Sequence, residues 1–203
     1  MKNARIKDLF SMSYKEFIEK AKECNSCPKK GYFNITPYGY IEKWEYGDCE
    51  SKSGYERHHI YEYKEVGLSD LETMINFKKE YGLEAAKKVN NELVWLTPFE
   101  HFLAHGKIVK ETHMKNSWGG CINLFFSFLD ENGDFKPDFI RSIEREYGLK
   151  KDPKILIKEH LMFNMVEDPY YASMVKGIET RYQLTYGKPF ISKKLFDKDV
   201  WGE

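Results

Sequence analysis

Apolar residues at helical or alternating spacing divide the first part of the chain into short elements. Ser13 and Glu16 form the start signal of an amphipathic helix over residues 14–23. Short strand-like pieces follow within residues 38–46, and residues 57–63 have the β-prone composition of a strand. This half of the chain is therefore expected to mix helix and strand.

Helix signals dominate further along the chain. Ser69 with Glu72 three residues later forms a capping box, and apolar residues continue at helical spacing until Gly82. Cap-then-proline signals and a stop glycine predict three more helices, over residues 138–147, 154–166 and 170–185. The C-terminal part is expected to be mostly helical.

The run Leu93-Val94-Trp95-Leu96 predicts a buried strand that leads directly into a helix. Thr97 suits the N-cap of this helix, Pro98 its first position, and Glu100 the third position of a capping box. The fold class is therefore α+β.

Composition and charge limit the class of protein. Hydrophobic residues make up 41% and aromatic residues 16% of the 203 residues, a composition that indicates neither disorder nor a disulfide scaffold. The 32 basic and 32 acidic residues cancel, which neither favours nor opposes a nucleic-acid partner, because phosphate binding needs only a local basic surface. No signal-peptide run and no stretch of about 18 apolar residues is present, so we expect a soluble, cytoplasmic protein without a membrane partner.

Four histidines carry the candidate chemistry. His101 and His105 are four apart, about 400° of rotation along the predicted helix, so both imidazoles lie on one face and can chelate one metal ion. His58 and His59 are neighbours on a predicted strand and point to opposite faces, so they must do different work. Hydrolysis of a phosphodiester needs such a division, with one group that deprotonates water and one that holds a cation.

The segments Glu56-Arg57-His58-His59-Ile60 and Leu93-Val94-Trp95-Leu96-Thr97-Pro98-Phe99-Glu100-His101-Phe102-Leu103-Ala104-His105 together resemble the signature of HNH endonucleases. The resemblance covers residues 55–110, about a quarter of the chain. It implies a ββα-metal finger embedded in a largely helical protein. It also implies that His58, His101 and His105 bind the metal and that His59 is the general base.

The family's orienting asparagine has no exact counterpart here. It should directly precede Leu93, where this chain has Glu92, with Asn91 one residue earlier. Either a one-residue bulge lets Asn91 orient the base, or Glu92 does so as an acceptor. The third alternative is impaired activity.

One catalytic divalent ion is expected, with Mg²⁺ or Mn²⁺ first and Zn²⁺ or Ni²⁺ as alternatives. Cys24 and Cys27 form half of a zinc knuckle, and Cys49 could supply a third ligand of a second, structural Zn²⁺, with Cys121 or His113 as the fourth. The alternative for these cysteines is two turn thiols and two buried thiols.

The sequence thus favours a metal-dependent endonuclease that cleaves double-stranded DNA at specific sites, of homing or restriction type, with a homodimer for double-strand cleavage. The alternatives are an HNH-derived DNA-binding or regulatory module that has lost catalysis, and a non-specific nuclease toxin. The expected organisation is residues 1–54 as an N-terminal helix and cysteine-containing segment, residues 55–110 as the catalytic core, and residues 111–203 as a helical region for substrate recognition.

Overall fold

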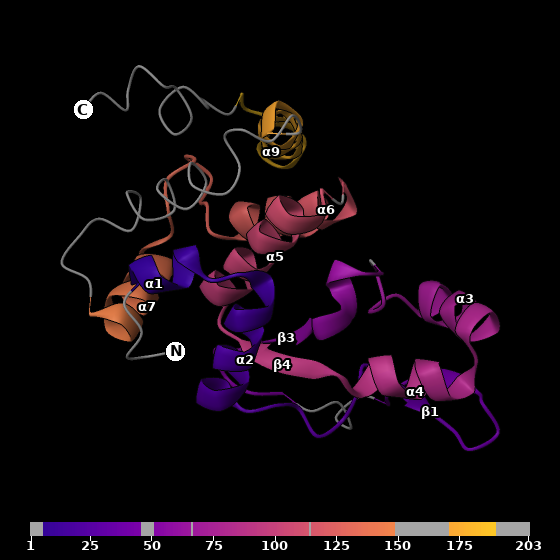
Figure 1. Cartoon of the computed structure of the whole chain (residues 1–203). Helices are drawn as coiled ribbons and strands as arrows, with labels where there is room; N and C mark the ends of the chain where they lie inside the picture. Colours follow the sequence, from indigo (N-terminus) through magenta and orange to yellow (C-terminus); the bar gives the residue numbers. More distant parts are fainter. Residues whose placement is uncertain (1–5, 46–50, 66, 114, 149–170, 190–203) are drawn as a thin grey trace. The chain divides into compact units, whose positions relative to one another are not determined.

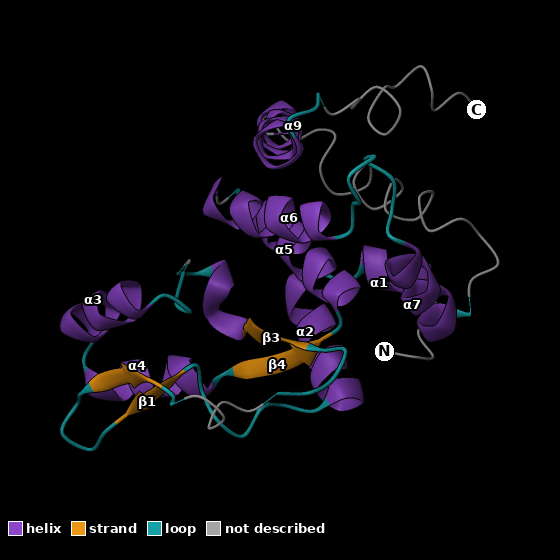
Figure 2. Cartoon of the chain, turned by 180° about the vertical axis from the view of Figure 1, so that it is seen from behind, coloured by secondary structure: helices purple, strands orange, loops and turns teal. Residues whose placement is uncertain are grey.

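The computed structural model describes residues 6–45, 51–65, 67–113, 115–148 and 171–189. Contacts between residues divide the chain into two compact units. The first comprises residues 14–101, and the second comprises the described parts of residues 2–13 together with those of residues 102–203. The fold is α+β, as predicted, with helices predominating over two small two-stranded sheets (Figures 1 and 2). No helix of the described residues combines the length and the apolar character needed to cross a bilayer.

In the first unit, strand β3 (Glu56–His59) pairs antiparallel with β4 (Leu93–Leu96). All four residues of β4 are buried, as its unbroken apolar run predicts. Helix α2 (Tyr14–Asn25) packs on this strand through its apolar face, on which Phe17, Ile18 and Ala21 are buried. The expected helix over residues 14–23 is therefore confirmed, and it extends two residues further.

The predicted capping box at the start of helix α5 (Pro98–Thr112) is also confirmed. The backbone N–H of Thr97 donates to a Glu100 carboxylate oxygen at 3.0 Å, and the Glu100 N–H donates to the Thr97 hydroxyl at 3.3 Å. The same carboxylate oxygen accepts from the side-chain amide of Asn25 at 2.7 Å. This buried network joins the end of α2 to the point where β4 becomes α5.

A second core lies beside this sheet, in the same unit. It consists of strands β1 (Phe33–Ile35) and β2 (Ile41–Lys43) with helices α3 (Leu71–Tyr81) and α4 (Leu83–Asn91). Its buried residues are Phe33, Leu68, Met74, Ala86 and Val89. The strand expected within residues 38–46 is thus short, and it pairs with a preceding strand that the sequence did not single out.

Two local expectations were wrong. The strand predicted over residues 57–63 ends at His59, and Ile60–Tyr63 form a single 3₁₀ turn, η1. The N-cap of α3 is Asp70 rather than Ser69, because the Asp70 carboxylate accepts from the Thr73 N–H at 2.9 Å.

The second unit is helical. Its helices within the described residues are α1 (Ile6–Ser11), most of α5, α6 (Lys115–Ser127), α7 (Pro137–Tyr147) and α9 (Tyr171–Tyr186). Its core is rich in aromatic residues, and pairwise ring contacts link five phenylalanines: Phe102, Phe125, Phe128, Phe135 and Phe139. The predicted helices near residues 138–147 and 170–185 are confirmed, whereas residues 154–166 lie outside the described part of the chain.

Buried Lys107 ties α5 to the end of α1. Its ammonium donates to the carbonyl oxygens of Phe10 at 3.1 Å and Met12 at 2.5 Å. A cation at these positions offsets the negative end of a helix dipole.

Candidate metal centre

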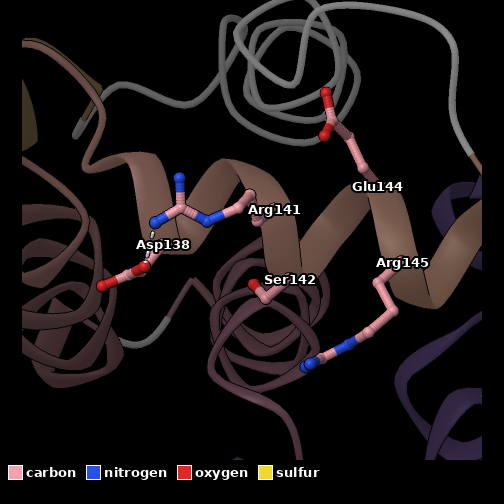
Figure 3. A pocket seen from close by; sticks show the side chains of 5 residues that line it. All are labelled: Asp138, Arg141, Ser142, Glu144 and Arg145. Atoms are coloured by element: carbon pink, nitrogen blue, oxygen red, sulfur yellow. Dashed lines mark hydrogen bonds and ion pairs between the residues drawn. The ribbon is translucent and has the colours of Figure 1, made fainter.

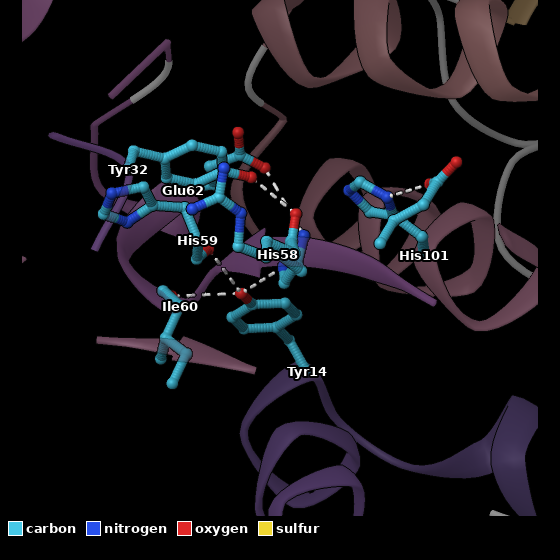
Figure 4. Close-up of polar contacts among 9 residues, drawn as sticks. Tyr14, Tyr32, His58, His59, Ile60, Glu62 and His101 are labelled. Carbon is cyan, nitrogen blue, oxygen red and sulfur yellow. Dashed lines mark hydrogen bonds and ion pairs between the residues drawn. The ribbon is translucent and has the colours of Figure 1, made fainter. Parts of the chain in front are cut away.

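His58 and His59 occupy opposite faces of β3, as strand alternation predicts. The His58 ring lies edge-on to His101, with 4.9 Å between ring centroids. The His59 ring stacks on Tyr32 at 5.5 Å with an interplanar angle of 9°. Figure 4 shows the two imidazoles in these different surroundings.

Four side chains form the candidate metal centre: His58, Glu62, His101 and His105. One potential ligand atom from each lies within 4.8 Å of all the others. Helix α5 supplies His101 and His105 one turn apart, β3 supplies His58, and η1 supplies Glu62. The three histidines that the sequence assigned to metal binding are therefore together, and no other group of three or more such side chains occurs among the described residues.

Glu62 is the member that the sequence prediction missed. A strand through residue 63 would have carried it away from His58, but the chain turns into η1 directly after His59. Its carboxylate consequently lies 3.6 Å from the Nδ1 atom of His58, four residues earlier. Burial raises the pKa of Glu62 to about 7, against the opposing effect of nearby His101. The usable sequence signal was a carboxylate four residues after the first histidine.

Glu56 orients His101. The Nδ1 atom of His101 is 2.6 Å from a Glu56 carboxylate oxygen, so Nδ1 carries the proton and donates it. The other ring nitrogen, Nε2, then has the lone pair that a metal ion requires.

The donor set fits a divalent ion. Ligand atoms on one tetrahedral Zn²⁺ lie about 3.3 Å apart. Donors within 4.8 Å of one another must therefore close by about 1.5 Å at their widest pair to reach that geometry. Three imidazoles with one carboxylate suit Mn²⁺, Ni²⁺ or Zn²⁺ better than Mg²⁺, which prefers oxygen ligands and keeps its waters.

His59 lies outside this group. Its side chain is buried, and neither ring nitrogen has a hydrogen-bond partner in the described structure. Burial lowers the pKa of His59 to about 4, so the ring is neutral at pH 7. The guanidinium of Arg57, two residues earlier on β3, lies 4.4 Å from the centroid of the Tyr32 ring that covers His59.

The two candidates for the orienting role, Asn91 and Glu92, lie at the end of α4. Asn91 is the last helical residue and Glu92 is the C-cap. The Glu92 backbone oxygen accepts from the Ile60 N–H at 3.0 Å, while its carboxylate lies 3.9 Å from Lys88. Neither side chain forms a hydrogen bond with His59 in the structure.

The cysteines do not form a metal site within the described residues. Cys24 and Cys27 are exposed free thiols, and Cys121 is buried. Cys49, the expected third zinc ligand, lies outside the described residues.

A pocket on α7 has a different character (Figure 3). It is lined by Asp138, Arg141, Ser142, Glu144 and Arg145. Arg141 is paired with Asp138 within the helix. None of these five residues belongs to the histidine group.

Comparisons of the chain with protein-family models, with curated proteins and with solved structures gave no match.

Proposed function

We propose that this protein is a metal-dependent endonuclease of the HNH type, which hydrolyses phosphodiester bonds of double-stranded DNA. One divalent ion would be held by His58, Glu62, His101 and His105, and His59 would be the general base. The observation that carries the proposal is the division of labour on β3. One histidine belongs to a four-donor group, and its neighbour is a neutral imidazole with no hydrogen-bond partner in the described structure.

His59 is suited to accept a proton because it is uncharged at pH 7. A pKa of about 4 makes it a weak base in this closed arrangement. The His59 side chain is buried with its ring stacked on Tyr32, and contact with water would return its pKa towards 6.5. Displacement of Tyr32 by substrate would therefore activate the base where it is needed.

A bound divalent ion would stabilise the negative charge that develops on the phosphate and on the leaving oxygen. The chain's own residues add to this. Arg57 lies on the same face of β3 as His59 and offers a guanidinium to a phosphate oxygen. Glu56 holds His101 in the tautomer that a ligand requires.

The pairing of β3 with β4, followed directly by α5, has the element order of a ββα-metal finger. Asn91 and Glu92 remain the two candidates for orienting His59 once substrate is bound. The ligand chemistry moves the expected ion from Mg²⁺ towards Mn²⁺, Ni²⁺ or Zn²⁺.

The decisive experiment combines plasmid cleavage with metal binding. Purified protein and its His59→Ala and His58→Ala variants are incubated with supercoiled plasmid and Mg²⁺, Mn²⁺, Zn²⁺ or Ni²⁺, and ion binding is measured by calorimetry. We expect nicked or linear DNA from the wild type, and metal binding without cleavage from His59→Ala. His58→Ala should lose both.

His113→Ala is the matched control, because His113 is exposed and lies outside the four-residue group. It should bind metal and cleave like the wild type. A wild-type protein that binds metal and DNA but cleaves nothing would support the binding-module alternative and reject the nuclease.

A further inference from the structure

We infer that the buried hydroxyl of Tyr14 is a positioning group for His58, which fixes the imidazole in the tautomer whose Nδ1 lone pair faces the metal centre. This inference rests on the proposed metal site. Tyr14 stands at the start of α2, far from the histidines in sequence, and no motif singles it out.

Counting donors around the hydroxyl assigns the proton positions. The Tyr14 oxygen lies 2.8 Å from His58 Nε2, 3.0 Å from the Ile60 carbonyl oxygen and 3.5 Å from the His59 carbonyl oxygen. Carbonyl oxygens only accept, so the single phenolic proton goes to Ile60, the nearer of the two. The hydroxyl then accepts from His58, and this requires the proton of His58 to be on Nε2.

The opposite assignment is unfavourable. If the hydroxyl donated to Nε2, its lone pairs would face the carbonyl oxygens of His59 and Ile60 without a proton between them. With Nε2 protonated, Nδ1 of His58 keeps its lone pair on the side of the Glu62 carboxylate, 3.6 Å away. That distance is too long for a hydrogen bond, and it brings together two groups that can both donate electrons to a cation.

The same hydroxyl also fixes the backbone that presents Glu62. Ile60 is the first residue of η1, and η1 carries the carboxylate. The Ile60 carbonyl oxygen accepts from the Tyr14 hydroxyl. The Tyr14 ring is buried, and its centroid lies 5.6 Å from that of Tyr63, the last residue of η1. The Tyr14 hydroxyl therefore contacts both the His58 ring and the backbone of η1, two parts of the proposed site (Figure 4).

Removal of the hydroxyl should favour the wrong tautomer. Without an acceptor at Nε2, the proton of His58 is better placed on Nδ1, from where it faces the Glu62 carboxylate. A proton in that position occupies the lone pair that a metal ion needs. Metal affinity should fall about 10- to 100-fold, as for other groups that orient histidine ligands.

The test is long-range ¹H–¹⁵N NMR of the histidine side chains in metal-free protein at pH 8, with His58 assigned by its absence in His58→Ala. We expect the proton of wild-type His58 on Nε2. In Tyr14→Phe, which keeps the ring and removes only the hydroxyl, we expect the Nδ1 proton to appear. Tyr63→Phe is the control and should match the wild type.

Calorimetry with Mn²⁺ and Zn²⁺ completes the experiment, with weaker binding expected for Tyr14→Phe and unchanged binding for Tyr63→Phe. A wild-type His58 protonated on Nδ1 overturns the inference without any variant having to fold. Equal affinities of Tyr14→Phe and the wild type also overturn it. If the wild type binds no ion, the proposed function fails, while the NMR result still decides the role of Tyr14.

Discussion

Gly120 on α6 lies directly against the imidazole of His105. A Cβ atom on Gly120 would stand 2.4 Å from Cε1 and 2.5 Å from Nδ1 of that ring. Real side chains do not approach this closely, so only glycine leaves His105 where it is. A helix with no ligand of its own therefore limits where one ligand of the candidate metal centre can lie.

Gly120→Ala should move His105 and weaken metal binding about tenfold or more, in the range found for other changes around ligands. Gly119→Ala is the control, because a Cβ there meets nothing within 4 Å. The control should bind metal normally and raise the free energy of unfolding by about 0.5–1 kcal/mol, since alanine favours a helix over glycine. Calorimetric titration and urea unfolding measure both effects. Equal metal affinity in the two variants would contradict the close approach.

The elements found from the sequence were those specified by local pattern. Helix α2 has an amphipathic repeat, β4 is an unbroken apolar run, and the start of α5 has its own capping residues. Each of these elements is specified by residues only a few positions apart, so it can be predicted from the sequence without knowledge of the fold. The placement of His101 and His105 followed from the same periodicity.

The remaining features depend on contacts that the sequence does not display. A single 3₁₀ turn is too short to show a repeating hydrophobic pattern, so residues 60–63 were predicted as part of a strand. The position of Glu62 next to His58 was missed for the same reason. Tyr14 and Gly120 act on histidines 44 and 15 residues away along the chain, through packing alone. Local pattern thus located the ligands on helix and strand but not the residues that hold them in place.

The N-cap of α3 offers a direct test of one corrected prediction. Asp70→Ala should lower the free energy of unfolding by about 1 kcal/mol, because it removes the acceptor for the Thr73 N–H. Ser69→Ala should change it by less than about 0.5 kcal/mol, as for most surface positions. Urea unfolding of the two variants shows which of these adjacent residues caps α3, since serine and aspartate are both favoured at the N-cap. A larger loss from Ser69→Ala would restore the original capping box.

His59 and Glu62, whose pKa values are both shifted by burial, should give opposite dependences of stability on pH in metal-free protein. The pKa of His59 is about 4 in the folded chain, below its usual 6.5, so acid protonates the unfolded chain first and favours unfolding. The pKa of Glu62 is about 7, above its usual 4.5, so acid protonates the folded chain first and favours folding. In the wild type the two effects largely cancel between pH 7 and 4.5.

Single substitutions separate the contributions of His59 and Glu62 to the pH dependence of stability. On acidification from pH 7.5 to 4.5, His59→Leu should lose about 2–3 kcal/mol less stability than the wild type, and Glu62→Gln should lose about 2–3 kcal/mol more. Urea unfolding at both pH values, with a chelator present, measures these differences. Identical pH profiles for all three proteins would show that neither group is buried as described.

Asn25 provides a comparison of one hydrogen bond in two environments. Its side-chain amide donates to the buried carboxylate of Glu100 at 2.7 Å, and Asn34 donates to the exposed carboxylate of Glu42 at the same 2.7 Å. The Asn25 amide also donates to the buried Trp95 carbonyl oxygen at 3.0 Å. Asn25→Ala therefore leaves two buried acceptors with one donor fewer each and should cost about 2–3 kcal/mol of unfolding free energy, because water cannot replace the lost donors. Asn34→Ala should cost less than about 1 kcal/mol of unfolding free energy, since water can donate to the exposed Glu42 carboxylate in place of Asn34. Equal losses in urea unfolding would mean that water reaches the start of α5, and the capping box would then contribute far less to holding His101 in place.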